Sequence, residues 1–209
     1  IKYVKSDKIL VCRPLLNLNY LDSYSYPKNK FFTIFYPSFP RTFKNFELIC
    51  YAIEMLPVKI RNEIVLEITI NGMENKYSSY IYRRFKKNIN INFIGLQNYR
   101  DTLKLINRCD LFVFPSKIET FGLPILEAIY FKKDIFLSDL PYAYEACNGY
   151  EKVKFLNPEK PEVWAECIKK QFEFYKFGLS NSLFSDDIKI PSYDNNIEGW
   201  DKMIDYIID

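Results

Sequence analysis

A chain of 209 residues with 48% hydrophobic and 18% aromatic residues can bury a large core, which excludes an intrinsically disordered protein. The 29 Lys and Arg against 26 Asp and Glu give a net charge of +3, too small to indicate nucleic-acid binding. The densest basic cluster, RRFKK at 83–87, is interpreted as the solvated end of a helix. Histidine is absent, which excludes an imidazole base and a His-rich metal site within this chain.

The five cysteines form no C-x-x-C pair and predict reduced, buried thiols in a cytoplasmic protein. They are Cys12, Cys50, Cys109, Cys147 and Cys167. No run reaches the roughly 18 apolar residues of a membrane span. The chain begins with Ile and shows no signal peptide, so we expect a piece of a longer protein.

In chain order, residues 1–29 hold one strand candidate, KILVC at 8–12, and then a polar, Tyr-rich connection. Apolar strand-like runs alternate with helical patterns from there on. The predicted strands are 30–36, 63–70, 91–95, 110–116, 134–138 and 153–156. The predicted helices are 44–56, 77–87, 99–109, one that begins within 114–128, 142–147 and 161–175.

This alternation, with strands apolar on both faces, predicts a doubly wound parallel sheet in an α/β, Rossmann-like domain over 30–177. Ligands of such sheets bind beyond the carboxyl ends of the strands. Residues 178–209 do not follow this alternation and predict a Ser/Asn/Asp-rich loop and a last amphipathic helix. That helix is expected to carry Ile197, Trp200, Ile204 and Ile207. We interpret both ends of the chain as connections to a neighbouring domain.

The stretch FPSKIETFGLPILEA at 114–128 predicts a strand, a turn and the start of a helix. Pro124 suits the first helical turn, where its missing N–H costs nothing. Gly122 lets a ligand approach the main chain closely. We therefore expect the amides of Phe121, Gly122 and Leu123 to point at an anionic or hydroxyl-rich ligand.

Two carboxylates flank this turn. Glu127, about one turn inside the helix, can accept hydrogen bonds from two vicinal hydroxyls, as a ribose diol presents them. Glu119, on the loop, would face another part of the same ligand. Each also has a structural alternative, since Glu127 could offset the helix dipole and Glu119 could cap the turn. Together with the amides, the two carboxylates suit a phosphorylated sugar.

A diphosphate also needs cations, and YPSFPRTFKNFE at 36–47 supplies Arg41 and Lys44 beyond the first strand of the repeat. They are expected at the same sheet edge as Glu119, where they could stabilise a departing nucleoside diphosphate. The alternative is that both are solvated surface residues. The sequence contains no D-x-D, so no carboxylate-held metal is indicated.

Three stretches together carry a resemblance to a family: RTFKN at 41–45, FPSKIETFGLPILEA, and LSDLPYAYEA at 137–146. They resemble the C-terminal, nucleotide-sugar-binding domain of family 4 glycosyltransferases of the GT-B fold. The resemblance covers about residues 30–170, and the E-x7-E pair behind R-x-x-K is its most specific part.

The resemblance implies a role for each of these residues. Glu127 would bind the ribose, and Glu119 would contact hydroxyls of the donor sugar as a catalytic residue. Arg41 and Lys44 would hold the diphosphate and also count as catalytic. The amides named above would lie near the sugar and phosphates, and the backbone of FIGLQN at 93–98 would contact the base. Pro40 departs from the family pattern, which has Gly before the arginine.

The resemblance also implies a retaining, metal-independent hexosyl transfer without a cofactor. The acceptor, a glycan or lipid-linked glycan, would bind a separate N-terminal domain. Residues 1–29 would then be the remnant of that domain and the linker, and 178–209 a loop and helix packing towards it. On its own the fragment is expected to be inactive. The expected setting is bacterial surface polysaccharide synthesis in the cytoplasm, with peripheral contact to the inner face of the membrane left open.

Two other interpretations remain. One is a non-catalytic nucleotide-binding or interaction domain on the same fold. The other is a sugar-nucleotide epimerase, which the order of the motifs disfavours. One bound nucleotide sugar accounts for Arg41, Lys44, Glu119 and Glu127 at once, whereas the structural alternatives need a separate reason for each.

Overall fold

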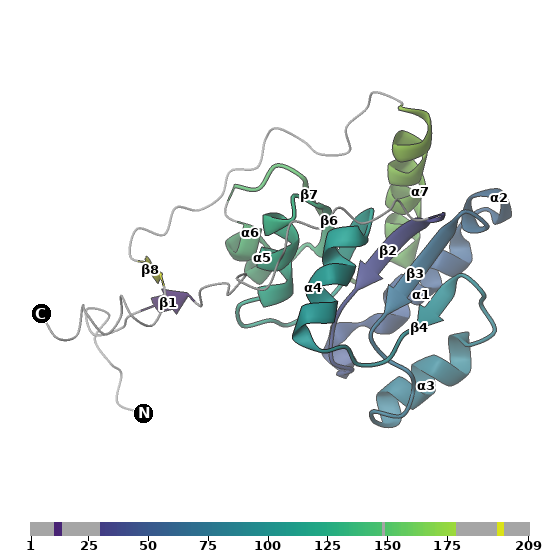
Figure 1. Cartoon of the computed structure of the whole chain (residues 1–209), viewed down its shortest axis with the longest axis horizontal. Helices are drawn as coiled ribbons and strands as arrows, with labels where there is room; N and C mark the ends of the chain where they lie inside the picture. Colours follow the sequence, from purple (N-terminus) through teal and green to yellow (C-terminus); the bar gives the residue numbers. More distant parts are fainter. Residues whose placement is uncertain (1–10, 14–29, 148, 179–195, 199–209) are drawn as a thin grey trace, which may run out of the picture.

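The computed structural model describes residues 11–13, 30–147, 149–178 and 196–198 (Figure 1). Its centre is a six-stranded sheet in which every pair of neighbours is parallel. The strands are β2 (Phe32–Tyr36), β3 (Ile64–Ile68), β4 (Ile91–Phe93), β5 (Leu111–Phe114), β6 (Asp134–Ser138) and β7 (Val153–Leu156). Each of the six predicted runs therefore contains a strand, which confirms that part of the prediction.

The strand order is β4-β3-β2-β5-β6-β7. The chain thus builds outward from β2 on one side, and then returns to add β5 on the other side of β2. Ile34 of β2 lies opposite Leu111 of β5. In an open α/β sheet the crevice beyond such a reversal is where ligands bind. The topology therefore directs attention to the loops that follow β2 and β5.

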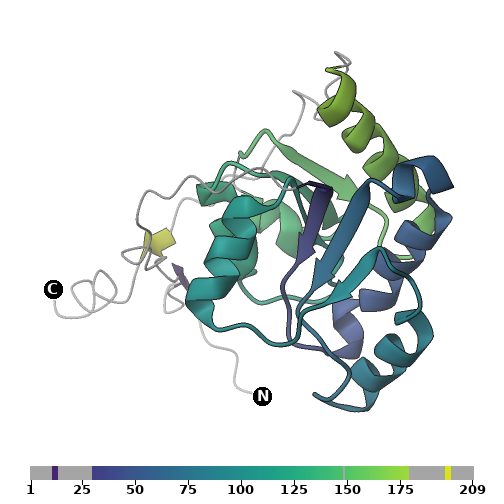
Figure 2. The same cartoon turned by 45° about the vertical axis from the view of Figure 1, so that its right-hand side comes forward.

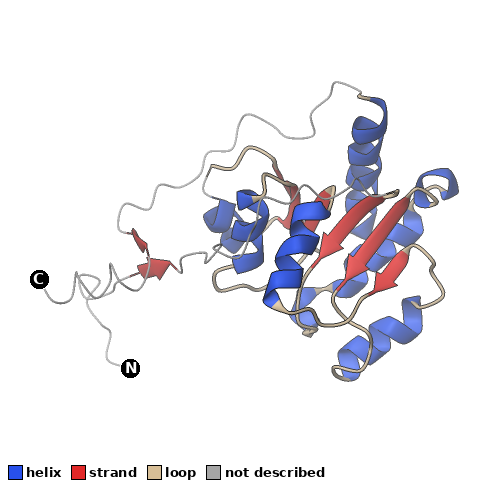
Figure 3. Ribbon diagram, viewed as in Figure 1, coloured by secondary structure: helices blue, strands red, loops and turns tan. Residues whose placement is uncertain are grey.

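Helices cover both faces of the sheet (Figures 1 and 3). They are α1 (Phe46–Met55), α2 (Val58–Arg61), α3 (Lys76–Phe85), α4 (Tyr99–Arg108), α5 (Leu123–Tyr130), α6 (Pro141–Cys147), α7 (Pro161–Phe177) and the short 3-10 helix η2 (Thr42–Lys44). Helix α1 contacts α3 and α7, whereas α5 contacts α4 and α6. Figure 2 shows α4 on the near side of the sheet and α1 beyond it. The predicted doubly wound, Rossmann-like α/β fold is confirmed.

Two short helices were not predicted. Helix α2 is a single turn between Pro57 and Asn62, too short to show a helical period. The predicted helix over 44–56 is divided: η2 ends at Lys44, and α1 begins at Phe46. The break falls at Asn45, whose φ of 56° lies in the left-handed region.

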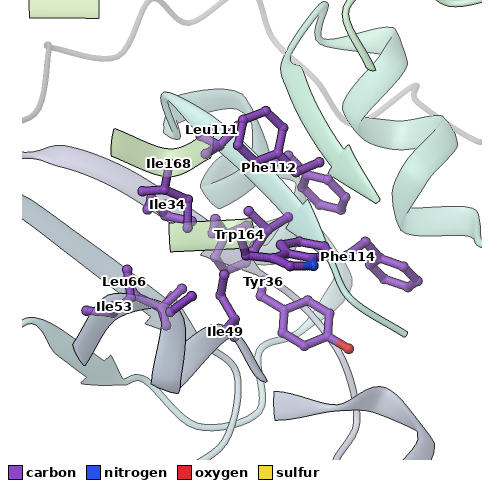
Figure 4. Close-up of a cluster of buried hydrophobic side chains, with 14 of the residues drawn as sticks. Ile34, Tyr36, Ile49, Ile53, Leu66, Leu111, Phe112, Phe114, Trp164 and Ile168 are labelled. Atoms are coloured by element: carbon purple, nitrogen blue, oxygen red, sulfur yellow. The ribbon is translucent and has the colours of Figure 1, made fainter. Parts of the chain in front are cut away.

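A buried cluster packs β2 and β5 against α1 and α7 (Figure 4). Its labelled members are Ile34, Tyr36, Ile49, Ile53, Leu66, Leu111, Phe112, Phe114, Trp164 and Ile168. The Tyr36 and Phe114 rings meet edge to face with centroids 5.5 Å apart, and the Trp164 indole N–H donates to the Asn157 carbonyl at 2.9 Å. Burial of each large apolar side chain contributes about 1.5–3 kcal/mol. The loops that follow β2 and β5 consequently start from fixed points.

A separate pair of strands, β1 (Val11–Arg13) and β8 (Asn196–Glu198), runs parallel. Strand β1 overlaps the predicted strand at 8–12. Ile197 was expected on an amphipathic helix, and this is wrong, because pairing with β1 overrides its helical spacing. Trp200, Ile204 and Ile207 lie outside the described residues. The division of the chain at residues 29 and 177 stays a prediction.

Two general predictions concern thiols and membrane spans. Cys50, Cys109, Cys147 and Cys167 are free and buried, as expected. The side chain of Cys12 lies outside the described part. Within that part, no helix combines the length and the apolar character needed to cross a membrane.

Candidate functional site

The loops after β2 and β5 lie against each other at the carboxyl ends of their strands. The Lys117 backbone N–H donates to the Phe43 carbonyl at 2.7 Å, and the Ser116 hydroxyl also reaches that carbonyl, at 3.4 Å. From the other side, the Tyr142 hydroxyl of α6 donates to the Ser116 carbonyl at 2.6 Å. The segment LSDLPYAYEA thus supports the β5 loop.

Lys44 and Glu119 form an ion pair across these two loops. Their side chains are only 15% and 11% exposed. The Lys44 ammonium also lies 5.4 Å from the Phe114 ring centroid. Two charges with so little access to water need each other, since an unpaired buried charge is costly. The structure therefore brings together the two residues that the sequence placed at one sheet edge.

Asn45 joins the loop after β2 to two other loops through its side chain. This residue was not identified from the sequence. Its side chain is buried, and its amide donates to the Pro115 carbonyl at 3.3 Å and to the Pro158 carbonyl at 2.8 Å. The Lys44 carbonyl next to it accepts from the Tyr36 hydroxyl at 2.6 Å. An Asn directly after a short helix is a signal for a left-handed residue, but nothing in the sequence points to these carbonyls.

Arg41 begins η2 with an extended backbone and is exposed to solvent. Its guanidinium lies 5.1 Å from the Phe39 ring centroid. Among the described residues Glu119 pairs with Lys44, and no ion pair joins it to Arg41. The preceding Pro40 is buried, and its carbonyl accepts from the Asn75 side chain at 2.7 Å. The unusual proline thus sits in a loop anchored to the start of α3.

Helix α5 begins as the sequence predicts. Gly122 is its N-cap with a φ of 61°, and Pro124 lies in its first turn. A Cβ added at Gly122 would come within 2.9 Å of the Ile125 side chain. Within the described part of the chain, the backbone N–H groups of Phe121, Gly122 and Leu123 donate to no protein acceptor. Unsatisfied N–H groups at a helix start attract anions and hydroxyls.

Glu127 lies in the second turn of α5 and is 4% exposed. Burial raises the pKa of this carboxyl to about 7, although a hydrogen bond with Tyr99 works in the opposite direction. Tyr99 is the first residue of α4 and follows directly on FIGLQN at 93–98. Sequence reasoning missed Tyr99, because a lone tyrosine at a helix start carries no pattern. Through Tyr99, the predicted ribose-binding carboxylate of Glu127 is connected to residues 93–98, the segment predicted to contact the base.

The loop at 93–98 has a defined shape. The Gln97 side chain donates to the carbonyls of Ile94, at 2.8 Å, and Gly95, at 3.2 Å. Gly95 has a φ of 70°, and Leu96 is 54% exposed. The loop therefore presents its backbone and one apolar side chain at the edge of the sheet.

Exposed apolar side chains lie close to Lys44 and Glu119 in the sequence, on the two loops and at the start of α5. A cluster of large apolar side chains on a protein surface marks a binding site for a ligand or another protein. They are Phe39 (45% exposed), Phe43 (37%), Ile118 (63%), Phe121 (49%) and Leu123 (40%). The charged centre is thus nearly enclosed, whereas its rim is apolar and open.

Acidic and thiol groups do not gather into a metal site. Among the described residues, no three His, Cys, Asp or Glu side chains lie close enough together to hold a metal ion. The site instead offers cations and backbone N–H groups to an anion. Metal independence stays a prediction.

The family model described as "Glycosyl transferases group 1" matches residues 19–175. That range contains every candidate site residue named above. A search of curated proteins gives no match.

Several solved structures share the fold. The catalytic domain of cholesterol-alpha-glucosyltransferase from Helicobacter pylori has a TM-score of 0.58 at 17% identity, with 70% of this chain and 89% of that chain covered. Anabaena HepE, solved with UDP-glucose, has a TM-score of 0.59 at 19% identity, with 69% and 40% covered. A glycosyltransferase from Rickettsia africae has a TM-score of 0.60 at 18% identity, with 74% and 41% covered. The chain thus spans well under half of the length of the last two.

Proposed function

The chain belongs to the group 1 family of glycosyl transferases, and on this basis we propose that it is the donor-binding domain of an enzyme that transfers a sugar from a nucleotide-diphospho-sugar to an acceptor. The observation that carries the proposal is the Lys44–Glu119 pair at the reversal of strand order between β2 and β5. We further propose that the enzyme is a retaining transferase of family 4 with the GT-B fold.

The diphosphate binds between the two loops. Lys44 turns from Glu119 towards the phosphate oxygens or is shared between them, and the exposed Arg41 swings in from its place against Phe39. Guanidinium and ammonium groups form strong, charge-assisted hydrogen bonds with phosphate. The N–H groups at the start of α5 add positive potential from the other side. These groups stabilise the charge of the departing nucleoside diphosphate, so that transfer needs no metal or other cofactor.

The sugar lies over Glu119. Because this carboxylate is already held by Lys44, it is positioned to accept hydrogen bonds from sugar hydroxyls before the donor binds. The N–H groups of Phe121, Gly122 and Leu123 reach the same sugar and its phosphate. Glu119 thereby fixes the anomeric carbon relative to the acceptor.

The nucleoside extends from there towards α4. Glu127 accepts from the ribose hydroxyls, and the backbone of 93–98 contacts the base. The contact between Glu127 and Tyr99 supports this arrangement, because it joins the two regions. HepE was solved in complexes with UDP and UDP-glucose, which makes a uridine nucleotide the first one to test.

The acceptor approaches over the apolar rim, from a domain that these residues do not include. HepE and the Rickettsia enzyme are more than twice as long as the part that this chain matches. We place the enzyme in the cytoplasm, as the four buried free thiols favour, in the synthesis of a bacterial surface polysaccharide. Its full-length form would take a glycan or lipid-linked glycan at the inner face of the membrane.

The test is the thermal unfolding midpoint of the chain with UDP, GDP, dTDP, ADP and CMP in turn. A nucleotide at 100 times its Kd stabilises the fold by about 2.7 kcal/mol. We expect a shift with one of the five, and loss of that shift in an Arg41→Ala/Lys44→Ala variant.

A Lys169→Ala/Lys170→Ala variant is the control, because it removes two cations from the surface of α7, where they pair weakly with Glu166. Shifts are compared with each protein's own ligand-free midpoint, since Lys44→Ala also leaves Glu119 unpaired. Absence of a shift with all five nucleotides would contradict the proposal for this chain.

A further inference from the structure

A hollow lies at the end of the sheet opposite the candidate site, where β3 and β4 begin. It is a cleft of about 450 Å³ between the end of α1, α2 and the end of α3. Its lining includes Glu54, Arg61, Arg84, Lys87, Ile89 and Asn90. This volume suits a small organic ligand. In Figure 1, α2 marks this end at the upper right, away from the carboxyl tips of the strands.

Positive charge dominates the cleft. Three of the lining residues are cations and one is an anion, which leaves an excess of two positive charges. Glu54 is already engaged: its carboxylate accepts from both terminal nitrogens of Arg84, at 3.3 and 3.1 Å, and its carbonyl accepts from Arg61 at 3.0 Å. Within the described part of the chain, the Lys87 side chain makes no hydrogen bond or ion pair. Glu54 therefore neutralises Arg84, whereas Arg61, which donates to a neutral carbonyl, and Lys87 keep their charge for an anion.

The walls of the cleft are held in place before any ligand binds. The Arg84 guanidinium lies 4.7 Å from the Phe85 ring centroid and 5.4 Å from that of Tyr51. The buried Asn90 side chain donates to the carbonyls of Arg61, at 2.7 Å, and Ile64, at 3.1 Å, so it joins the end of α2 to the start of β4. A pre-formed site of this kind loses little entropy on binding.

Polar and apolar groups complete the lining. Two further asparagines, Asn62 and Asn88, bring side-chain amides that can donate to an anion. Ile89, on the lip of the cleft, is 90% exposed. Such a combination suits a phosphate that carries an organic group better than a bare ion, because the apolar lip can contact the organic part.

The simpler explanation is that RRFKK at 83–87 is a solvated helix end. It accounts for Arg84 and Lys87, which lie at or just beyond the C-terminal turn of α3, where cations are favourable. It does not account for Arg61, which comes from α2, or for the way Asn90 fixes the two segments together.

We propose that this cleft binds a phosphate ester through Arg61, Arg84 and Lys87, independently of the nucleotide site at the other end of the sheet. The phosphate lies between Arg61 and Lys87, and the Arg84 guanidinium, held by Glu54, lines its approach. A soluble organic phosphate and the headgroup of an anionic lipid share this chemistry. Both fit the apolar lip.

Calorimetric titration of the whole chain with glycerol 3-phosphate tests the soluble source. Sedimentation with phosphatidylcholine vesicles, with and without phosphatidylglycerol, tests the lipid source at about 0.15 M salt, where weak surface attraction is screened. We expect saturable binding in at least one arm. Arg61→Ala/Lys87→Ala should weaken it at least tenfold, whereas Lys169→Ala/Lys170→Ala, with the same charge change, should leave it within twofold.

Two further variants complete the test. Lys87→Glu reverses the charge at an exposed position and leaves the Arg61 contact to Glu54 in place. If Arg61→Ala impairs folding, this variant still tests the proposal. Arg41→Ala tests whether the probe binds at the nucleotide site instead of the cleft. It should leave the affinity for the probe unchanged. Binding in neither arm, or equal affinity of the wild type and the Lys87→Glu chain, would overturn the proposal.

Discussion

The Lys44 ammonium and the Glu119 carboxylate form an ion pair although 75 positions separate them in the sequence. The pair exists because the chain reverses its strand order at β2 and inserts β5 beside it, which places the two following loops together. In the proposed enzyme this pair has two tasks: Lys44 binds the diphosphate, and Glu119 binds the sugar.

Replacement of Glu119 separates these tasks. In Glu119→Gln, Lys44 no longer has an anionic partner and is available to the phosphates. We expect the affinity for the free nucleoside diphosphate to stay within about threefold or to improve, because the variant keeps the Lys44 cation and removes the carboxylate that competes with the phosphates for it. The advantage of the nucleotide sugar over the free nucleotide should be lost. Calorimetry with both ligands measures this ratio.

Glu151→Gln, at an exposed position after α6, is the control for removal of one negative charge. A Glu119→Gln chain that still prefers the nucleotide sugar by the wild-type factor would show that Glu119 does not contact the sugar.

Glu127→Gln should make the protein more stable and at the same time a poorer nucleotide binder. The folded-state pKa of Glu127 is about 7, above its ordinary value of 4.5, because burial disfavours the charge. The folded state therefore holds the proton more tightly than the unfolded chain, so this residue makes stability fall as pH rises from about 4.5 to 7. The variant lacks this loss and should gain on the order of 3 kcal/mol at pH 8.

Urea unfolding at pH 5 and pH 8 checks the difference. The gain should be small at pH 5 and complete at pH 8, whereas nucleotide affinity should fall at least tenfold. Equal stability of the wild type and the variant at pH 8 would mean that Glu127 is not held in a charge-disfavouring environment.

Asn45 is expected to be a positioning residue for Lys44. Asn45→Gly tolerates the left-handed backbone but leaves the Pro115 and Pro158 carbonyls without their donor, which should cost about 1–3 kcal/mol. Asn45→Ala adds the strain of a φ of 56°, about 1 kcal/mol more. Urea unfolding should give the order wild type, Gly, Ala.

Nucleotide affinity should fall in both Asn45 variants under conditions where circular dichroism shows them folded. Asn45→Gly that keeps wild-type affinity would restrict Asn45 to a structural role.

Gly122 and Gly178 form a matched pair for the start of α5. Both have left-handed backbones, with φ of 61° and 62°, but only at Gly122 would an added Cβ meet another group, the buried Ile125 side chain at 2.9 Å. Gly178→Ala should cost about 1 kcal/mol for backbone strain alone. Gly122→Ala should cost roughly 1 kcal/mol more, because Ile125 has to shift in a packed core. Equal losses in urea unfolding would show that Ile125 yields freely.

The central strands and the main helices could be predicted because apolar runs and helical periods record burial directly. The placement of Lys44 at the same sheet edge as Glu119 could also be predicted, since parallel strands bring their following loops to one edge, but the ion pair between them was not predicted. Helix α2 was missed because four residues show no period. Ile197 was misassigned because its helical spacing is local, whereas its pairing with β1 depends on residues far away in the sequence.

The supporting contacts of the site were beyond the sequence for a related reason. Asn45 and Tyr99 each act through one side chain that hydrogen-bonds to distant segments, and a single residue leaves no spacing to recognise. Arg41 and Lys44 looked equivalent, yet one is exposed against Phe39 and the other is enclosed with Glu119. Only the fold distinguishes them.

The most direct test of the account is a calorimetric comparison of UDP and UMP binding to the wild type and to Arg41→Ala/Lys44→Ala; if the melting series identifies another base, its diphosphate and monophosphate are used. If the two loops form a diphosphate site, the wild type should bind the diphosphate at least tenfold more tightly than the monophosphate, and the variant should bind both equally weakly. A wild type that does not distinguish the two, or a variant that keeps the preference, would contradict the assignment of Arg41 and Lys44 to the diphosphate.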